Sequence, residues 1–258
     1  MIVCTKRIFD VLCALCIIYY LCKPKAVFCR INASNPLNLL KTIMKQIDKI
    51  LAEKLLHISA IKLQPANPFV WASGWNSPIY TDNRVTLSYP DVRNFIKVEL
   101  SRLIIENFGD AEVVAGVATG AIAQGALVAD TLGLPFVYVR STPKDHGLEN
   151  LIEGNIKPGQ KVVIVEDLVS TGKSSLKAAQ AITEAGGEVV GMVAIFTYEF
   201  PEAERAFDDA GIRLLTISTY SAMIEAAAHI NYVKESDIAT LQQWRQDPAN
   251  WTPSSEVD

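Results

Sequence analysis

The sequence predicts an α/β fold, a doubly wound, mostly parallel sheet flanked by helices. Short runs rich in Val and Ile, typical of strands buried on both faces, alternate with helical stretches of about 10–15 residues. Gly-containing turns separate many of these segments, and half of the 258 residues are hydrophobic, which is enough for a substantial core. This alternation favours a parallel sheet, because each crossover helix returns the chain to the same edge.

The strands and helices of this sheet are expected in alternating order. The expected strands are 112–117, 136–140, 162–165, 188–196 and 213–218. The expected helices are one from Met44, 89–107, 121–132, one from Ser174, 201–210, and a helical tail from Tyr220 whose last element is 237–246. Pro90 suits the first turn of its helix, and Gly109 follows the end of the same helix.

Three other segments are expected to be less regular. Residues 60–71 form an extended segment broken by prolines, and residues 72–84 form a turn between two short strands. Residues 141–154 are polar without apolar periodicity, so we predict a loop there, with Gly147 and Gly154 able to act as hinges.

The segment 161–175 (KVVIVEDLVSTGKSS) carries the clearest chemical signal. Val162–Val165 predicts a buried strand, with Glu166 and Asp167 at its C-terminal end, where ligands of open α/β sheets bind. A Ser/Thr/Gly loop then leads into a helix, offering backbone N–H groups and a helix N-terminus to a phosphate. Two acids beside a phosphate site suggest a sugar phosphate.

This segment has two alternative interpretations. A nucleotide-binding P-loop requires a glycine five residues before Gly172, and Asp167 stands there, so we reject it. The segment could also be an ordinary crossover whose acids are merely solvated. Against that, the carboxyl ends of parallel strands share one edge, so the Thr119–Gly120 turn, the loop after Arg140 and residues 166–174 should converge on one pocket.

The N-terminal region differs from the rest in composition. All five cysteines lie within residues 1–29, so a disulfide framework, a zinc site and a cysteine nucleophile are excluded for the remainder. Residues 1–43 carry six Lys/Arg and one acid, whereas the rest carries 18 basic and 27 acidic residues. An acidic body argues against nonspecific nucleic-acid binding.

The 12-residue apolar run Val11–Cys22 is short for a membrane span and lacks a clear signal-peptidase site. We favour a translation start at Met44 over a signal or anchor. Residues 1–43 are therefore expected to lie outside the fold, 44–235 to form the functional domain, and 236–258 to form a C-terminal helix and tail. A cytoplasmic protein without membrane or nucleic-acid partners is expected.

Three separated motifs resemble the type I phosphoribosyltransferases, and among them the family that uses orotate. Residues 162–174 are similar to the family's motif for phosphoribosyl pyrophosphate (PRPP). Residues 69–84 are similar to the N-terminal hood of the orotate enzymes, and residues 140–147 to their mobile catalytic loop. The resemblance covers roughly residues 44–235 and implies the type I phosphoribosyltransferase fold, with a small N-terminal hood at 60–90.

The resemblance implies a role for each matching residue. Glu166 and Asp167 would hold the ribose hydroxyls, and Lys144, His146 and Asp167 would be the catalytic set. The orotate contacts would be Tyr80, Arg84 and Ser170. The PRPP contacts would be Arg140, Ser141, Lys144, His146, Glu166, Asp167, Leu168, Val169, Ser170, Thr171, Gly172, Lys173 and Ser174.

The resemblance also implies a cofactor and an assembly. Mg2+ would be held mainly by PRPP, with no direct side-chain ligand, and the loop 140–154 would complete the site of the neighbouring subunit in a homodimer. The implied reaction gives orotidine 5′-monophosphate and pyrophosphate in pyrimidine biosynthesis. The alternatives are a purine phosphoribosyltransferase, which the hood and loop motifs disfavour, and a PRPP-binding regulator, which would have lost the loop cations.

The chain departs from the family pattern around the base. Ala72 and Ser141 stand where lysines are frequent, and the stretch 196–201 lacks an arginine that helps to grip orotate. Arg84 is a plausible replacement, because a guanidinium grips a carboxylate at two points. Arg84 could equally form a structural ion pair with Asp82.

Overall fold

The structure is a computed structural model that describes residues 36–71, 73–142 and 151–253, with side chains from Gln46 onward. The chain divides into compact units at Met1–Leu40 and Lys41–Asp258, and the second contains the fold described below. Within the part of the chain that the structure describes, no helix combines the length and apolar character needed to cross a membrane.

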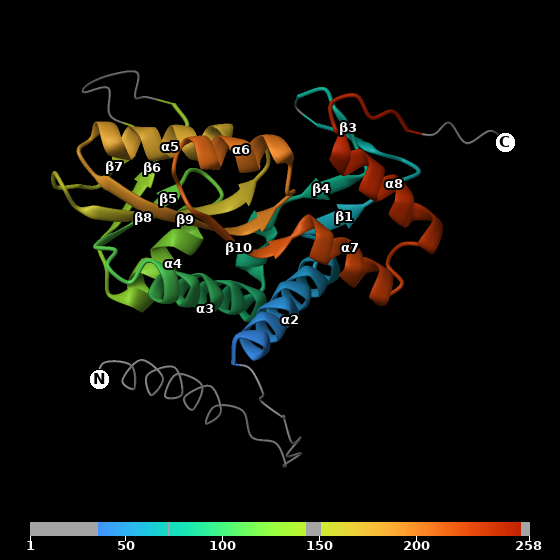
Figure 1. Ribbon diagram of the computed structural model, residues 1–258, viewed down its shortest axis with the longest axis horizontal. Coiled ribbons are helices and arrows are strands. Elements are labelled where there is room, and N and C mark those ends of the chain that lie inside the picture. Colours follow the sequence, from blue (N-terminus) through green and yellow to red (C-terminus); the bar gives the residue numbers. More distant parts are fainter. Residues whose placement is uncertain (1–35, 72, 143–150, 254–258) are drawn as a thin grey trace, which may run out of the picture. The chain divides into compact units, whose positions relative to one another are not determined.

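A six-stranded sheet forms the centre of this unit, in the order β10-β9-β8-β5-β6-β7 (Figure 1). Its strands are β5 (Val113–Val117), β6 (Phe136–Val139), β7 (Ile152–Glu153), β8 (Lys161–Val169), β9 (Glu188–Thr197) and β10 (Leu214–Thr219). All neighbouring pairs are parallel except β6 and β7. The predicted mostly parallel sheet is confirmed.

Helices cover both faces of the sheet, as doubly wound topology requires. The helices are α2 (Pro36–His57), α3 (Pro90–Asn107), α4 (Ile122–Leu132), α5 (Lys173–Glu184), α6 (Pro201–Asp209), α7 (Tyr220–His229) and α8 (Glu235–Gln246). Figure 1 shows α5 and α6 along one face and α3 and α4 along the other. Pro90 begins α3, and α4 ends at Gly133 with φ +66°.

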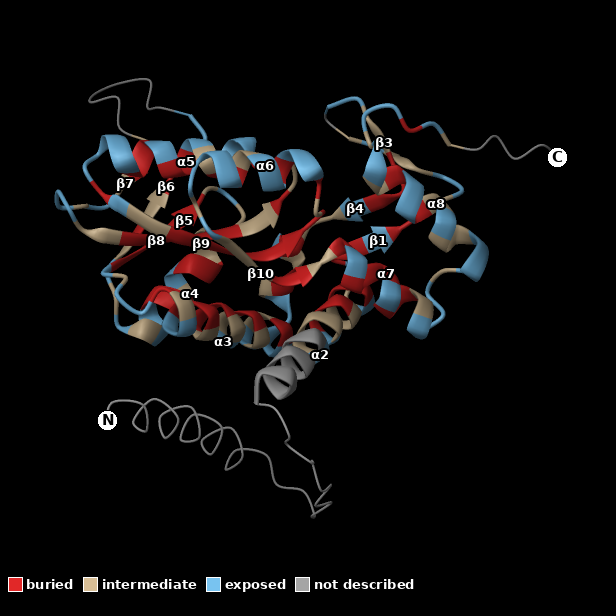
Figure 2. Cartoon of the chain, in the orientation of Figure 1, coloured by how far each residue is buried: buried red, intermediate tan, exposed pale blue. Residues whose placement is uncertain are grey.

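The apolar residues of β8 pack into the hydrophobic cores on both faces of the sheet. Val162 and Ile164 belong to the core that contains Ile182 of α5, whereas Val163 and Val165 belong to the core on the other face. Successive strand residues point to opposite faces, so a strand covered on both sides is apolar throughout. Figure 2 shows the resulting band of buried residues along the central strands.

The hood is built from two small antiparallel pairs. β1 (Ile61–Leu63) pairs with β4 (Ile79–Thr81), and β2 (Phe69–Val70) pairs with β3 (Asn76–Ser77). Helix α8 packs against it: the Trp244 ring lies 5.5 Å from that of Trp71, and Trp244 Nε1 donates to the Asn76 carbonyl at 3.1 Å. Trp244 is fully buried, so the C-terminal helix helps to hold the hood in place.

Several elements differ from the sequence expectation. The first helix begins at Pro36 rather than Met44. Strand β8 continues to Val169, because Leu168 and Val169 pair with β9, so the two acids lie inside the strand rather than after it. Strand β7 and the 3-10 helix η1 (Asn83–Ser88) were not expected. Strand β7 has only two residues and depends on pairing with β6, so no periodic pattern could reveal it.

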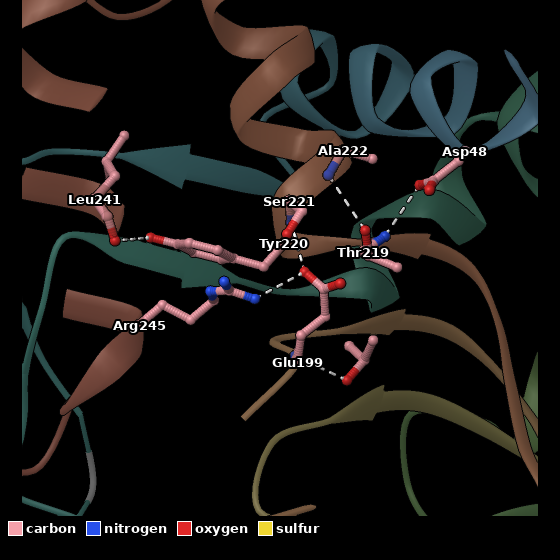
Figure 3. Close-up of polar contacts among 9 residues, drawn as sticks. Asp48, Glu199, Thr219, Tyr220, Ser221, Ala222, Leu241 and Arg245 are labelled. Atoms are coloured by element: carbon pink, nitrogen blue, oxygen red, sulfur yellow. Dashed lines mark hydrogen bonds and ion pairs between the residues drawn. The ribbon is translucent and has the colours of Figure 1, made fainter. Parts of the chain in front are cut away.

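A polar network joins α2 to the ends of β9 and β10 (Figure 3). Asp48 of α2 accepts a hydrogen bond from the Thr219 backbone N–H at the start of α7, at 3.1 Å. The Ser218 hydroxyl donates to the Asp48 carbonyl at 2.9 Å. The pKa of Asp48 is raised from 3.8 to about 6, chiefly by burial and in smaller part by the negative charges of Glu199 and Glu225, while the hydrogen bonds with Ser218 and Thr219 partly oppose the rise. The charged form of Asp48 is therefore disfavoured in the folded protein.

Replacing Asp48 by asparagine should make stability less dependent on pH. The pKa of Asp48 is higher in the folded protein than in the unfolded chain. Ionisation of Asp48 therefore lowers the free energy of unfolding as the pH rises from about 4 to above 6. The side-chain oxygen of asparagine can accept the same hydrogen bond from the Thr219 backbone N–H. We expect D48N to match the wild type at pH 4 and to be more stable by about 1 kcal/mol at pH 8, which is less than the full pKa shift would give because Asp48 is partly exposed and solvent screens its charge. Thermal unfolding of both proteins at pH 4 and pH 8 measures this difference in stability. A difference between D48N and the wild type that is the same at both pH values would contradict the prediction.

Candidate active site

Glu166 lies inside β8, close to the carboxyl end of the strand, and hydrogen bonds hold its side chain. It is only 3 % exposed, and its two carboxylate oxygens accept hydrogen bonds from the Ser175 hydroxyl at 2.9 Å and the Asp167 backbone N–H at 3.0 Å. Burial raises the pKa of Glu166, and the neighbouring charge of Asp167 raises it further. Ser175 lies in the first turn of α5, so the strand and the helix that follows it fix this acid together.

Asp167 is surrounded by three segments of the chain. Burial raises the pKa of its carboxyl group, and the nearby guanidinium of Arg84 lowers it. Asn83 of η1 donates to the Asp167 carbonyl at 2.6 Å. A Cβ atom at Gly120 would overlap the Asp167 carboxylate, so only glycine allows this carboxylate its present position. The expected convergence of the Thr119–Gly120 turn with the acid pair is therefore observed.

A cavity of about 560 Å³ lies between the hood and the loop after β8. The hood provides aromatic walls, and the loop provides small polar residues. The lining residues are Val70, Trp71, Ser73, Trp75, Tyr80, Thr81, Leu168, Ser170, Thr171, Lys173, Tyr198 and Glu202. The Trp71 and Trp75 rings are stacked with centroids 6.3 Å apart, and Trp71 Nε1 donates to the Ile79 carbonyl at 3.1 Å. A flat ring bearing polar substituents suits this lining.

The structure brings many of the expected binding residues to this cavity. Tyr80, Leu168, Ser170, Thr171 and Lys173 all line it. The loop ends at Gly172, which directly precedes the first residue of α5. Its φ of +80° lies in the left-handed region that favours glycine. Lys144 and His146 lie outside the described residues, as do Gly147 and Ala72.

The remaining expected residues in the described ranges do not line the cavity. Ser141 and Ser174 are exposed, and Val169 is buried. Arg140, at the end of β6, forms an ion pair with Glu153 at 3.5 Å. Arg84 does not line the cavity. Its guanidinium contacts both carboxylate oxygens of Asp82, at 2.7 and 3.0 Å, which is the ion pair that the sequence left open.

Sequence reasoning missed several residues of the site, and Asn83, Ser175 and Tyr198 are among them. Asn83 and Ser175 hold the acid pair, as described above, and Tyr198 lines the cavity. Ser175 could have been suspected from its place in the first turn of the signature helix. The position of Asn83 depends on η1, and that of Tyr198 depends on the turn after β9. Neither element has a local sequence pattern that would predict it. Tyr198 lies in the stretch that lacks the expected arginine.

The turn that carries Tyr198 is fixed by its neighbour Glu199 (Figure 3). Glu199 has a φ of +54°, which is uncommon for a residue other than glycine. Its carboxylate accepts from the Ser221 backbone N–H at 2.7 Å and pairs with Arg245 at 3.4 Å, while its own N–H donates to Thr197 Oγ1 at 3.1 Å. Helices α7 and α8 thus stabilise the strained conformation that follows Tyr198.

The acid pair provides oxygen donors but too few for a metal cage. Over the described ranges, no three His, Cys, Asp or Glu side chains form a group that could hold a metal ion. Mg2+ usually binds through one or two carboxylates together with substrate phosphates and water. The residues present therefore fit a Mg2+ ion that a phosphorylated substrate holds for the most part.

Comparisons with known proteins agree with this geometry. Residues 96–226 match the family model of the phosphoribosyl transferase domain. The chain is 65% identical over 208 residues to the orotate phosphoribosyltransferase of Bacteroides thetaiotaomicron, covering 81% of this chain and 98% of that protein. It is 52% identical over 205 residues to that of Listeria monocytogenes, covering 80% of this chain and 98% of the relative.

Solved structures show the same fold. The orotate phosphoribosyltransferase of Aeropyrum pernix has a TM-score of 0.63 at 26% identity, covering 71% of this chain and 99% of that one. The Leishmania donovani UMP synthase has a TM-score of 0.68 at 23% identity, covering 81% of this chain and 44% of that one. At this identity the second likeness is one of fold.

Proposed function

We infer the reaction from the family, because the chain belongs to the orotate phosphoribosyltransferases: it transfers the phosphoribosyl group of PRPP to orotate, a step of pyrimidine biosynthesis. The products are orotidine 5′-monophosphate and pyrophosphate. The observation that supports this most directly is the acid pair, a buried Glu166 and a half-buried Asp167, beside a cavity walled by aromatic residues of the hood. A sugar and a flat base can then lie next to each other, as the transfer requires.

The acid pair holds the ribose in this proposal. Carboxylates accept hydrogen bonds from vicinal hydroxyls, and a pair held in place by the surrounding chain orients the sugar ring before reaction. Backbone N–H groups from Val169 to Ser174, at the start of α5, cradle the 5′-phosphate, since a helix N-terminus favours an anion. Ser170 and Tyr80 face the base from the loop and the hood, and both line the cavity.

The loop cations act on the leaving group. Breaking the bond from ribose C1 to pyrophosphate leaves positive charge on the sugar and negative charge on the departing oxygens, while a ring nitrogen of orotate forms the new bond to C1. Arg140, Lys144 and His146 contact the pyrophosphate and stabilise this charge as it develops. A bound Mg2+ ion, held mainly by PRPP, would add positive charge that favours departure of the pyrophosphate. A closed loop also excludes water that would hydrolyse PRPP.

The loop 140–154 completes the site of the neighbouring subunit in a homodimer. Mixing two inactive variants, K144A and D167N, tests this. If Lys144 acts across the interface, each mixed dimer holds one intact site, and an equal mixture should recover about a quarter of the wild-type activity per subunit. Activity assays after verified subunit exchange measure it. No recovery would show that each site is complete within one chain.

The reaction itself is tested by substrate choice. Mg2+-dependent consumption of PRPP is measured with orotate and, in parallel, with adenine, hypoxanthine and uracil. We expect turnover with orotate alone. Turnover with a purine in preference to orotate, or none with any base, would overturn the assignment.

A further inference from the structure

Orotate differs from uracil by a carboxylate, and that group needs a cation. The cavity has aromatic walls, so a carboxylate placed against them loses part of its hydration, and a positive partner would compensate for that loss. Arg84 does not supply this partner in the structure, since both of its hydrogen bonds go to Asp82 and it does not line the cavity. The described stretch 196–201 offers Tyr198 rather than a cation.

Lys173 is the only positively charged side chain among the described residues that line the cavity. Its ammonium lies 3.0 Å from a carboxylate oxygen of Glu202, which also lines the cavity. The two side chains are 79% and 48% exposed, and an ion pair so exposed contributes little to stability. The Lys173 ammonium can therefore exchange Glu202 for another carboxylate at small cost.

The position of Lys173 in α5 is a second sign of function. It is the first residue of the helix, where the helix dipole disfavours a cation and favours an anion. A lysine there gains nothing from the helix itself. It does add positive charge to the end of the helix nearest the cavity, which suits an anionic ligand.

We propose that the Lys173 side chain recognises the carboxylate of orotate, and that Glu202 holds it at the cavity until the base binds. This rests on the proposed function and adds to it the residue that selects a pyrimidine carboxylate over uracil. The flexible four-carbon stem of lysine allows the ammonium to turn from α6 to the bound base. The backbone N–H of the same residue remains available to the 5′-phosphate, so the side chain and the backbone serve different ligands.

Lys173→Met tests the proposal, because methionine keeps most of the stem and removes the charge. We expect KM for orotate to rise on the order of 10- to 100-fold, the usual effect of losing a charge-assisted hydrogen bond, while KM for PRPP changes less than about 2-fold. Lys173→Arg should restore most of the orotate affinity. Lys177→Met, which removes an exposed lysine of the same helix outside the cavity lining, should leave both constants unchanged.

Other outcomes decide against the proposal. An unchanged KM for orotate in K173M would overturn it, and so would a rise in KM for PRPP alone, which would assign the side chain to the 5′-phosphate. Glu202→Gln should lower KM for orotate or leave it unchanged, and a rise as large as that of K173M would contradict the role given to Glu202. Wild-type protein that fails to use orotate would instead overturn the proposed function.

Discussion

Replacing Asp167 by asparagine should lower kcat/KM for PRPP on the order of 100-fold and leave the fold intact. The change replaces a charged carboxylate by a neutral amide, which has only one accepting oxygen, at a half-buried position where water compensates only in part. Steady-state kinetics with PRPP varied at saturating orotate measure it. Unaltered kcat/KM would remove Asp167 from the site.

Gly120→Ala should reproduce much of this loss without touching the acid. The added methyl group would overlap the Asp167 carboxylate and displace it from its present position. Gly133→Ala is the matched control: Gly133 is left-handed with open space around it, so the change there strains the end of α4 but leaves the site alone. Loss of activity in G133A but not in G120A would contradict the placement of Asp167.

Replacing Lys144 by alanine should lower kcat by about 10²–10³-fold while weakening PRPP binding little. The reason is that negative charge grows on the pyrophosphate as its bond to C1 breaks, so a cation there stabilises the transition state more than the bound substrate. Turnover at saturating substrates, together with PRPP binding by calorimetry, separates the two effects.

Lys157→Ala serves as the control for Lys144. Lys157 is exposed in the turn between β7 and β8 and does not line the cavity, so its removal should change neither kcat nor PRPP binding. Equal losses of turnover and affinity in K144A would argue against a role on the leaving group, because that pattern reports contact with the ground state.

The sheet could be predicted because its strands carry their own signal. Val162–Val165 is apolar throughout since both faces of β8 are covered, and Pro90 and Gly133 mark helix ends through local backbone preferences. The acid pair could be predicted for the same reason, because Glu166 and Asp167 interrupt an apolar strand close to its carboxyl end. Local sequence preferences were therefore sufficient to predict the strand, the helix ends and the acid pair.

The rest of the site depends on contacts between distant segments. Asn83 reaches the Asp167 carbonyl from η1, 84 residues away in sequence. The conformation after Tyr198 depends on Ser221 and Arg245, which belong to α7 and α8. Such contacts leave no periodic pattern in the sequence, so tertiary structure alone identifies them. From the sequence, Arg84 could bind either the orotate carboxylate or Asp82, and in the structure it pairs with Asp82.

The crystal structure of the protein with orotidine 5′-monophosphate tests the central claim most directly, because this product carries the sugar, the phosphate and the base together. We predict that its ribose hydroxyls contact Glu166 and Asp167, that its phosphate lies on the backbone from Val169 to Ser174, and that its ring occupies the cavity beside Tyr80 and Lys173. A product whose ribose lies away from the acid pair, or whose base lies outside that cavity, would contradict the account.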